Sequence, residues 1–271
     1  MMASSNPLPQ QSAQDHQIPK KIWIYTNYDC NLSCSYCVAE SSPKASRRAL
    51  DQGTVKWLVD GAQALQFEHV YFTGGEPFLI AEIYEMLAYS SERLQTTVLT
   101  NAMLLHGRRL DRLYAIKNDN LVVQVSLDGC CPEHHDPYRG VGSWAKTVTG
   151  IRNLQEQFFR VRLSTTETRK NTNHLAELCT FHLAMGIPED DHIIRPLAKR
   201  GFSTEGMEVG KHNLLPEITV NCDGVYWHPL STGKDMQLAD RILPLAEVIC
   251  RLRAELEEMS AVSQAQHSTF Q

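Results

Sequence analysis

Three cysteines lie within eight residues near the start of the sequence, in the segment Cys30-Asn-Leu-Ser-Cys34-Ser-Tyr-Cys37. Thiolates at this C-x3-C-x2-C spacing can converge on one soft metal centre. A structural zinc site takes four ligands, but the next His and Cys along the chain are only His69 and Cys130. Iron–sulfur clusters also take four cysteines as a rule. Three cysteines therefore predict a cluster in which one iron is left open for another ligand.

Polar motifs follow the ends of later β-rich runs. One run ends at Thr73 and continues as Gly74-Gly75-Glu76-Pro77. The glycines permit close approach of the backbone to a ligand, and the Glu76 carboxylate can accept hydrogen bonds from an ammonium group. The polar residues after the next two runs are Asn101, Ser126 and Asp128. Taken singly, each of these residues also fits an ordinary turn or helix cap.

The elements that would position these residues alternate between short β-rich runs and amphipathic helical patterns, which is typical of a parallel α/β sheet. Six strands are predicted, over residues 22–26, 70–73, 97–100, 121–127, 161–165 and 192–195. Helices are predicted around 55–65, 83–87, 107–116, 143–158 and 173–185. The fold class is therefore predicted as α/β, a partial (β/α)6 TIM-like barrel whose site lies at the carboxyl ends of its strands.

A different pattern follows residue 200. Apolar runs at 218–220 and 225–227 flank Asn221-Cys222-Asp223-Gly224, whose Asp-Gly pair predicts a tight hairpin, and a helix with an apolar face from Ile242 to Leu256 follows. Trp227 and His228 could line the substrate cleft or close the end of the barrel, and we expect them to close the barrel because two β/α units are missing. The domain prediction is a flexible tail over 1–19, the barrel core over 20–200, this extension over 201–259 and a flexible tail over 260–271.

Cys30, Cys34 and Cys37, with Tyr36 before the third cysteine, resemble the signature of the radical S-adenosylmethionine (SAM) superfamily. The resemblance covers residues 20–200 and implies that the three thiolates hold a [4Fe–4S] cluster, whose fourth iron binds the amino and carboxylate groups of SAM. It also implies that Tyr36 lies near the adenine. The implied site for the SAM amino group consists of Gly74, Gly75 and Glu76. The implied contacts to ribose and methionine come from Asn101, Ser126 and Asp128.

The segment His135-Asp-Pro-Tyr-Arg139-Gly resembles the SPASM and anaerobic sulfatase-maturase-like branch of that superfamily. There an arginine at the Arg139 position reaches the SAM carboxylate. The alternative is that Arg139 pairs with a surface acid. The branch carries auxiliary clusters on a cysteine-rich extension. The stretch 214–228 resembles the hairpin of such an extension, with Cys222 on its turn, but the companion cysteines are missing.

The resemblance implies an enzyme in which a reduced cluster donates one electron to SAM, and a 5′-deoxyadenosyl radical then abstracts hydrogen from a small-molecule or peptide substrate. The expected cofactors are the [4Fe–4S] cluster and SAM, and the expected electron donor is a protein such as flavodoxin or ferredoxin. The maturase-like motif favours a peptide substrate, whereas the short extension favours a small molecule. The alternative is a non-catalytic zinc or iron–sulfur module completed by a partner's ligand, which gives no reason for the motifs at 74–77 and 126–128.

Five of the eight cysteines remain outside the triple. Cys130 and Cys131 follow the fourth predicted strand and, with Cys222, are the candidates for substrate binding or for a second centre. Two others fall in helical stripes and are expected in the core, namely Cys179 and Cys250. His134 and His135 are adjacent, so we expect their side chains to point apart on a solvated loop.

Composition limits the possible classes of function. Of 271 residues, 42% are hydrophobic and 21% charged, with a formal charge of −5, as in a globular protein and unlike a disordered one. This acidic balance argues against nucleic-acid binding, which usually needs a basic face. The N-terminus lacks an apolar signal region and no stretch is long enough to span a membrane. We therefore expect no membrane partner and a cytoplasmic location, where clustered thiols stay reduced.

Overall fold

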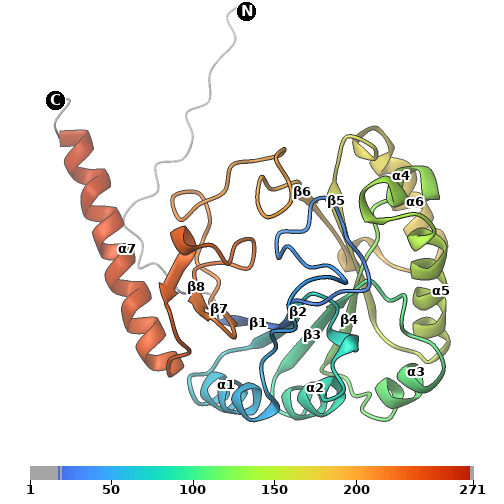
Figure 1. The fold of residues 1–271 in the computed structure, drawn as a ribbon, viewed down its shortest axis with the longest axis horizontal. Coiled ribbons are helices and arrows are strands. Elements are labelled where there is room, and N and C mark those ends of the chain that lie inside the picture. Colours follow the sequence, from blue (N-terminus) through green and yellow to red (C-terminus); the bar gives the residue numbers. More distant parts are fainter. Residues whose placement is uncertain (1–17, 19, 269–271) are drawn as a thin grey trace, which may run out of the picture.

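The structure, a computed structural model, describes residue 18 and residues 20–268. Its centre is one sheet of nine strands in the order β6-β5-β4-β3-β2-β1-β7-β8-β9 (Figure 1). The strands are β1 Lys21–Asn27, β2 His69–Gly74, β3 Gln95–Thr100, β4 Leu121–Ser126, β5 Val161–Glu167, β6 His192–Pro196, β7 Thr219–Asn221, β8 Gly224–Tyr226 and β9 Gln237–Ala239. Strands β1 to β6 pair in parallel with their neighbours. With their helices they form the predicted partial (β/α)6 barrel, whose sheet does not close on itself.

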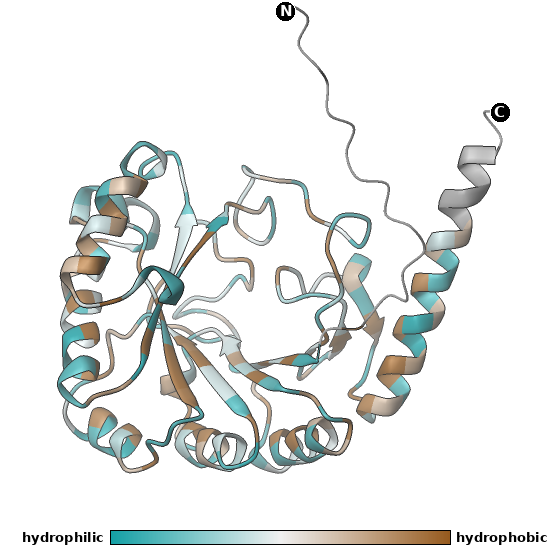
Figure 2. Ribbon diagram, turned by 180° about the vertical axis from the view of Figure 1, so that it is seen from behind, coloured by the Kyte–Doolittle hydropathy of each residue, from teal (hydrophilic) through white to brown (hydrophobic). Residues whose placement is uncertain are grey.

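Helices cover the outer face of this sheet, with their apolar sides toward the strands (Figure 2). They are α1 Gln52–Ala64, α2 Ile83–Ser91, α3 Gly107–Tyr114, α5 Ser143–Glu156 and α6 Leu175–Ala184. Two further helices lie elsewhere: α4 Pro132–Arg139 packs on α5, and α7 Leu245–Ser268 packs on α1 and β9. Short 3-10 turns lie at Pro77–Leu79, Thr172–His174, Glu189–Asp191 and Lys234–Met236. In α1, Asp51 caps the first turn by accepting a hydrogen bond from Thr54 N at 2.9 Å. The predicted stripe of this helix is buried, at Val55, Leu58, Val59 and Ala62.

The C-terminal part extends the sheet at β1 instead of closing the barrel. β7 pairs in parallel with β1, placing Trp23 opposite Thr219 and Ile24 opposite Val220. The predicted hairpin joins β7 to β8, and β9, which was not predicted, pairs with β8. Trp227 is buried in the core, but the prediction that it closes the barrel is wrong. The extension pairs with β1 because β1 would otherwise be an edge strand. Its unpaired backbone N–H and C=O groups form their hydrogen bonds with β7.

Two predictions about side-chain exposure are also wrong. His134 and His135 lie in α4 and not on a solvated loop, because Pro132 occupies the first position of a helix, where its missing N–H costs nothing. Cys250 is exposed. The buried side of α7 instead passes through Leu245, Val248 and Leu252.

Both predicted tails lie at the limits of the described chain. The tail expected at 1–19 falls outside the described residues except for Ile18. At the other end, α7 runs through Ser268, so much of the stretch 260–271 is helical, which its Ala and Gln residues favour. Residues 269–271 lie outside the described part. No helix within the described ranges combines the length and apolar character needed to cross a membrane.

Candidate active site

One cavity lies at the carboxyl ends of the barrel strands. Ten of the eleven residues predicted for the cluster and SAM line it, namely Cys30, Cys34, Tyr36, Cys37, Gly74, Gly75, Glu76, Asn101, Ser126 and Arg139. The eleventh, Asp128, is not among the lining residues. These residues come from the loops after β1, β2 and β3, from the end of β4 and from α4. Parallel pairing brings them together, because the carboxyl ends of adjacent strands meet at one edge of the sheet.

The three cysteines lie on the irregular segment between β1 and α1, which is held by backbone hydrogen bonds to distant parts of the chain. Ser35 N donates to Tyr138 O of α4 at 2.9 Å, and Phe202 N donates to Cys37 O at 3.1 Å. The cysteine loop is therefore fixed both by α4 and by the segment that follows β6.

The three cysteine sulfur atoms, as they stand, are not gathered closely enough for all of them to bind a single ion. Cys30, Cys34 and Cys37 line one cavity, yet their Sγ atoms do not all lie within 4.8 Å of one another. Thiolates on one tetrahedral zinc lie about 3.8 Å apart at Zn–S bonds of about 2.3 Å, whereas a cluster takes its thiolates on separate irons. Leu32 N donates a hydrogen bond to the sulfur of Cys30, and Ser41 N donates one to the sulfur of Cys37, each at 3.4 Å.

Burial makes two of these thiols hard to ionise in the protein alone. It raises the pKa of Cys30 to about 12 and that of Cys34 to about 11. Ligation by these residues must therefore displace a proton from each, and the positive charge of bound irons would offset the cost of burying the thiolates.

Gly74 and Gly75 bring the end of β2 against the segment after β1. A Cβ at Gly74 would lie 2.3 Å from the carbonyl oxygen of Asn27, and one at Gly75 would lie 2.0 Å from that of Asp29. Gly74 also has a φ of +126°, which L side chains rarely adopt. Both glycines line the cavity, but the close backbone approach that they permit is to the protein's own chain.

Glu76 is 1% exposed and accepts three hydrogen bonds. They come from Thr100 Oγ1 at 2.8 Å, Asn101 N at 2.9 Å and Phe78 N at 3.2 Å. Burial nevertheless raises the pKa of this carboxyl to about 7. Within the described chain no salt bridge reaches Glu76, so an ionised carboxylate here is short of a positive partner. A cationic group of a ligand in the cavity would supply that partner.

Asp128 connects two residues of the cavity wall. Its Oδ2 accepts hydrogen bonds from the Tyr36 hydroxyl and from Arg139 Nε, the latter at 2.6 Å, while its Oδ1 accepts one from Thr166 N at 2.9 Å. Burial alone would raise the pKa of Asp128, but the Arg139 charge and these hydrogen bonds outweigh it and lower the pKa. Asp128 is therefore ionised and holds the side chains of Tyr36 and Arg139.

Arg139 forms an ion pair with Asp128. One of the two alternatives for Arg139 was a pair with a surface acid, but this acid is buried. The Arg139 side chain is 9% exposed, and the partner carboxylate is 1% exposed. Arg139 Nε donates the hydrogen bond to Asp128 Oδ2, and the two Nη atoms donate to no residue in the described part of the chain. The Nη side of the guanidinium thus stays available on the cavity wall for a carboxylate.

Several lining residues were not predicted, namely Thr73, Thr100, Ser164, Thr166 and Arg195. Four of them are the last or next-to-last residue of β2, β3, β5 or β6, so the rule that found Ser126 would also have found them. Ser164 is the exception, because it lies in the middle of β5. His135 was missed as well. It is fully buried in α4, and its Nδ1 accepts a hydrogen bond from Asp128 N at 3.1 Å. No sequence pattern separates this histidine from a solvated one.

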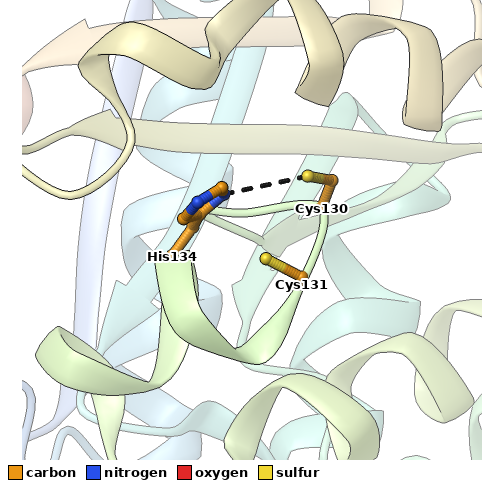
Figure 3. A group of neighbouring side chains, drawn as sticks. All are labelled: Cys130, Cys131 and His134. Atoms are coloured by element: carbon orange, nitrogen blue, oxygen red, sulfur yellow. Dashed lines mark hydrogen bonds between the residues drawn. The ribbon is translucent and has the colours of Figure 1, made fainter.

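The remaining candidate cysteines lie in two different places. Cys130 and Cys131 are half-buried at the start of α4, where His134 joins them (Figure 3). Cys222 lies on the β7–β8 turn and packs with Tyr25 and Tyr28. In the sheet, β4 and β7 are separated by β3, β2 and β1. The structure therefore does not gather Cys222 with the other two.

Comparison with known proteins agrees with this geometry. The sequence model of the protein family described as the radical SAM superfamily matches residues 24–178 of this chain. The AdoMet-dependent heme synthase of Methanosarcina barkeri is 28% identical over 182 residues, which are 66% of this chain and 51% of that protein. The mycofactocin maturase MftC of Mycobacterium tuberculosis is 32% identical over 161 residues, which are 59% of this chain and 40% of that protein. The chain thus spans about half or less of the length of these relatives.

Among solved structures, anSMEcpe with bound AdoMet and the Cp18Cys peptide is similar, with a TM-score of 0.64 and 14% sequence identity. The similarity covers 84% of this chain and 79% of that chain. It shows that the two chains share the fold of an open barrel.

Proposed function

The chain belongs to the radical SAM superfamily, and from this we propose that it is an enzyme that holds a [4Fe–4S] cluster on Cys30, Cys34 and Cys37 and binds SAM in the same cavity. The bound cluster supplies one electron to the SAM sulfonium, which breaks a carbon–sulfur bond to give methionine and a 5′-deoxyadenosyl radical that takes hydrogen from the substrate. The electron comes from a small redox protein of the flavodoxin or ferredoxin class.

The observation that carries this proposal is the unpaired buried carboxylate of Glu76 in a cavity that also holds three cysteines and a partly free guanidinium. Glu76 suits an ammonium group, and the Nη atoms of Arg139 suit a carboxylate. An α-amino acid such as the methionine part of SAM carries both groups. The zinc alternative gives no reason for this pair of opposite charges.

The other lining residues have roles that follow from this placement. The ring of Tyr36, held by its hydroxyl on Asp128, is proposed to lie against the adenine. The ribose and methionine are proposed to contact Asn101 and Ser126. Asp128 acts through Tyr36 and Arg139 as a positioning residue.

The substrate is proposed to be a peptide side chain. The supporting observations are the mycofactocin maturase among the relatives and the peptide bound to anSMEcpe. Arg195, next to the last residue of β6, also lines the cavity and forms no salt bridge with any described residue. A guanidinium in this position favours a substrate with an anionic group near the reacting carbon.

The test is an assay for 5′-deoxyadenosine after anaerobic purification and reconstitution with iron and sulfide, in the presence of dithionite and SAM. The wild-type chain should form 5′-deoxyadenosine and bind about four irons. Cys34→Ala should bind less iron and form none, whereas Cys250→Ala, which changes an exposed cysteine of α7, should behave as wild type. Full iron binding without 5′-deoxyadenosine would contradict the enzymatic proposal. Zinc binding without iron would favour the non-catalytic module.

A further inference from the structure

A second group of potential metal ligands lies outside the cavity, at the junction of β4 and α4. The Sγ atoms of Cys130 and Cys131 and one ring nitrogen of His134 all lie within 4.8 Å of one another (Figure 3). Cys130 Sγ is 3.8 Å from His134 Nδ1. Within the described chain this is the one set of three or more His, Cys, Asp or Glu side chains that meets this distance limit. All three are half-buried, and none lines the cavity described above.

The local backbone is built to bring these three side chains together. Gly129 lies against the first turn of α4, where a Cβ would be 2.6 Å from His134 Cβ and 3.0 Å from His135 N. Only a residue without a side chain lets the loop fold back this closely. Trp144 Nε1 donates to the Gly129 carbonyl oxygen at 3.0 Å and fixes the same point from α5. The arrangement therefore does not depend on a flexible surface loop.

The imidazole is held as well. The His134 ring stacks on the His174 ring at a centroid distance of 4.0 Å and an interplanar angle of 23°. His174 Nδ1 lies 3.1 Å from a carboxylate oxygen of Glu177. The stacked neighbour restricts the plane of the His134 ring, whose Nδ1 faces the Cys130 sulfur.

Two thiolates and an imidazole form the donor set of a thiophilic ion of the zinc class. Around tetrahedral Zn²⁺ the sulfur–sulfur separation is about 3.8 Å and the sulfur–nitrogen separation somewhat less, so the atoms need to move by about an ångström or less. Two thiolate charges neutralise the ion, which limits the cost of burying it. Glu133, the next residue but one after Cys131, lies beside the Cys131 thiol and can supply the fourth ligand, or water can.

We propose that Cys130, Cys131 and His134 form a binding site for a thiophilic divalent metal ion, for which Zn²⁺ is the expected occupant. An iron–sulfur cluster normally needs more cysteine ligands than this site offers. Cys222 cannot supply a third thiol, because it lies on the β7–β8 turn, and three strands of the sheet separate β7 from β4. This inference uses no residue of the proposed SAM cavity and does not depend on the function proposed there.

The site also has a structural consequence. α4 is only eight residues long and contains Pro137, so it is a weak helix by itself. Its last residue is Arg139, and its Tyr138 carbonyl accepts the hydrogen bond from Ser35 N of the cysteine loop. A metal ion at the first turn of α4 would tie it to the end of β4 and thereby steady Arg139 and the cysteine loop.

The first experiment uses the unaltered chain. The purified protein, reconstituted with iron and sulfide and then freed of loosely bound metal, is kept anaerobic with a phosphine reductant. It is alkylated with and without added Zn²⁺, and each cysteine is read by mass spectrometry. We expect Zn²⁺ to slow the alkylation of Cys130 and Cys131 and to leave the rates at Cys222 and Cys250 unchanged. Equal rates at Cys130 and Cys131 with and without Zn²⁺ would overturn the proposal, as would a disulfide between them that persists under reductant.

The second experiment measures stoichiometry with Co²⁺, whose absorption reports thiolate ligands. The background is the full chain with Cys30, Cys34 and Cys37 changed to Ala, which removes the competing thiols. It should bind about one Co²⁺ per chain with sulfur-to-metal charge-transfer bands. Adding Cys130→Ser and Cys131→Ser should abolish the bands, whereas the matched control Cys250→Ser should keep them. Bands that survive the loss of Cys130 and Cys131 would overturn the proposal. If the background chain does not fold, the alkylation of the unaltered chain decides the question.

Discussion

The buried ion pair between Asp128 and Arg139 fixes two side chains of the cavity wall at once. One oxygen of Asp128, Oδ2, accepts hydrogen bonds from both the Tyr36 hydroxyl and Arg139 Nε. Each of these three groups would be costly to bury alone, and together they satisfy one another. The geometry of the proposed SAM cavity therefore depends on a residue that does not line it.

Removing the charge of Asp128 should strongly destabilise the protein. In Asp128→Asn the Arg139 guanidinium stays buried without a counter-charge, which typically costs about 3 to 5 kcal/mol of unfolding free energy. Adding Arg139→Met to Asp128→Asn should recover much of that loss, because no unpaired charge then remains. Chemical denaturation of the two variants measures both changes.

The matched control for this pair is Glu247→Gln, which breaks the exposed i,i+4 pair with Arg251 on α7. Its expected cost is below about 0.5 kcal/mol. If Asp128→Asn costs no more than Glu247→Gln, the buried pair does not organise the wall as described.

Glu76 gives the stability of the ligand-free chain a pH dependence of unusual sign. Its pKa is raised from 4.5 to about 7 by burial, so between these pH values the folded chain keeps a proton that the unfolded chain has released. The free energy of unfolding should therefore fall as the pH rises through this window. The total effect is about 3 kcal/mol, at about 1.4 kcal/mol per pH unit.

The comparison that isolates this effect is wild type against Glu76→Gln, which is neutral at every pH. The wild-type chain should lose stability relative to the variant between about pH 5 and about pH 7 and run parallel to it at higher pH. A difference in unfolding free energy that stays constant across this range would show that Glu76 is ionised at low pH despite its burial.

At the scale of elements, the hydrophobic pattern predicted the barrel well, and tertiary pairing decided the rest. Strands β1 to β6 alternate with helices whose stripes face the sheet, so each has a local signal. β9 has three residues and exists because β8 offers it a partner, which no local pattern encodes. α4 was missed since its run from Pro132 to Arg139 contains two prolines and two histidines and lacks an apolar stripe.

Two glycines within helices should respond to alanine in opposite directions. At Gly61 in α1 a Cβ would lie 3.6 Å from Leu245 Cδ1, an ordinary contact, whereas at Gly150 in α5 it would lie 2.2 Å from the Ala102 carbonyl oxygen. Gly61→Ala should therefore stabilise the protein by about 0.5 to 1 kcal/mol. Gly150→Ala should destabilise it by about 2 kcal/mol or more, since backbone must move.

Thermal unfolding of the two glycine variants beside wild type tests this contrast. Each variant is the other's control, because both replace a helical glycine by the same residue. A rise of the unfolding temperature in both variants would mean that helix propensity, and not the space around each glycine, decides the outcome. A fall in both would mean that Gly61 has no room for a Cβ either.

At the scale of the whole molecule, much of the candidate site could be predicted because parallel strands end at one edge, so residues at strand ends, such as Glu76 and Ser126, meet there. The sequence could not show which of those side chains face a ligand and which face each other. Asp128 and Arg139 illustrate this limit, since their pairing depends on how α4 packs. Neither could it show that the segment after β6 returns to support the cysteine loop.

That support predicts that the barrel core and the C-terminal extension fold as one unit. β7 covers the edge of β1, and Trp23 Nε1 donates to Glu217 Oε2 at 2.6 Å. Phe202 N holds the Cys37 carbonyl oxygen at 3.1 Å. A chain that ends at Arg200 loses all of these contacts and exposes an apolar edge strand.

The chain that ends at Arg200 should therefore fail to bind iron stoichiometrically after anaerobic reconstitution and should expose apolar surface to a fluorescent dye. The matched control ends at Ser260 and keeps β7, β8, β9 and the packing of α7 on α1. It should bind about four irons, as expected for the full chain. If the shorter chain also bound about four irons and unfolded cooperatively, the core from 20 to 200 would be an independent domain, and the cysteine loop would not need the extension to hold its shape.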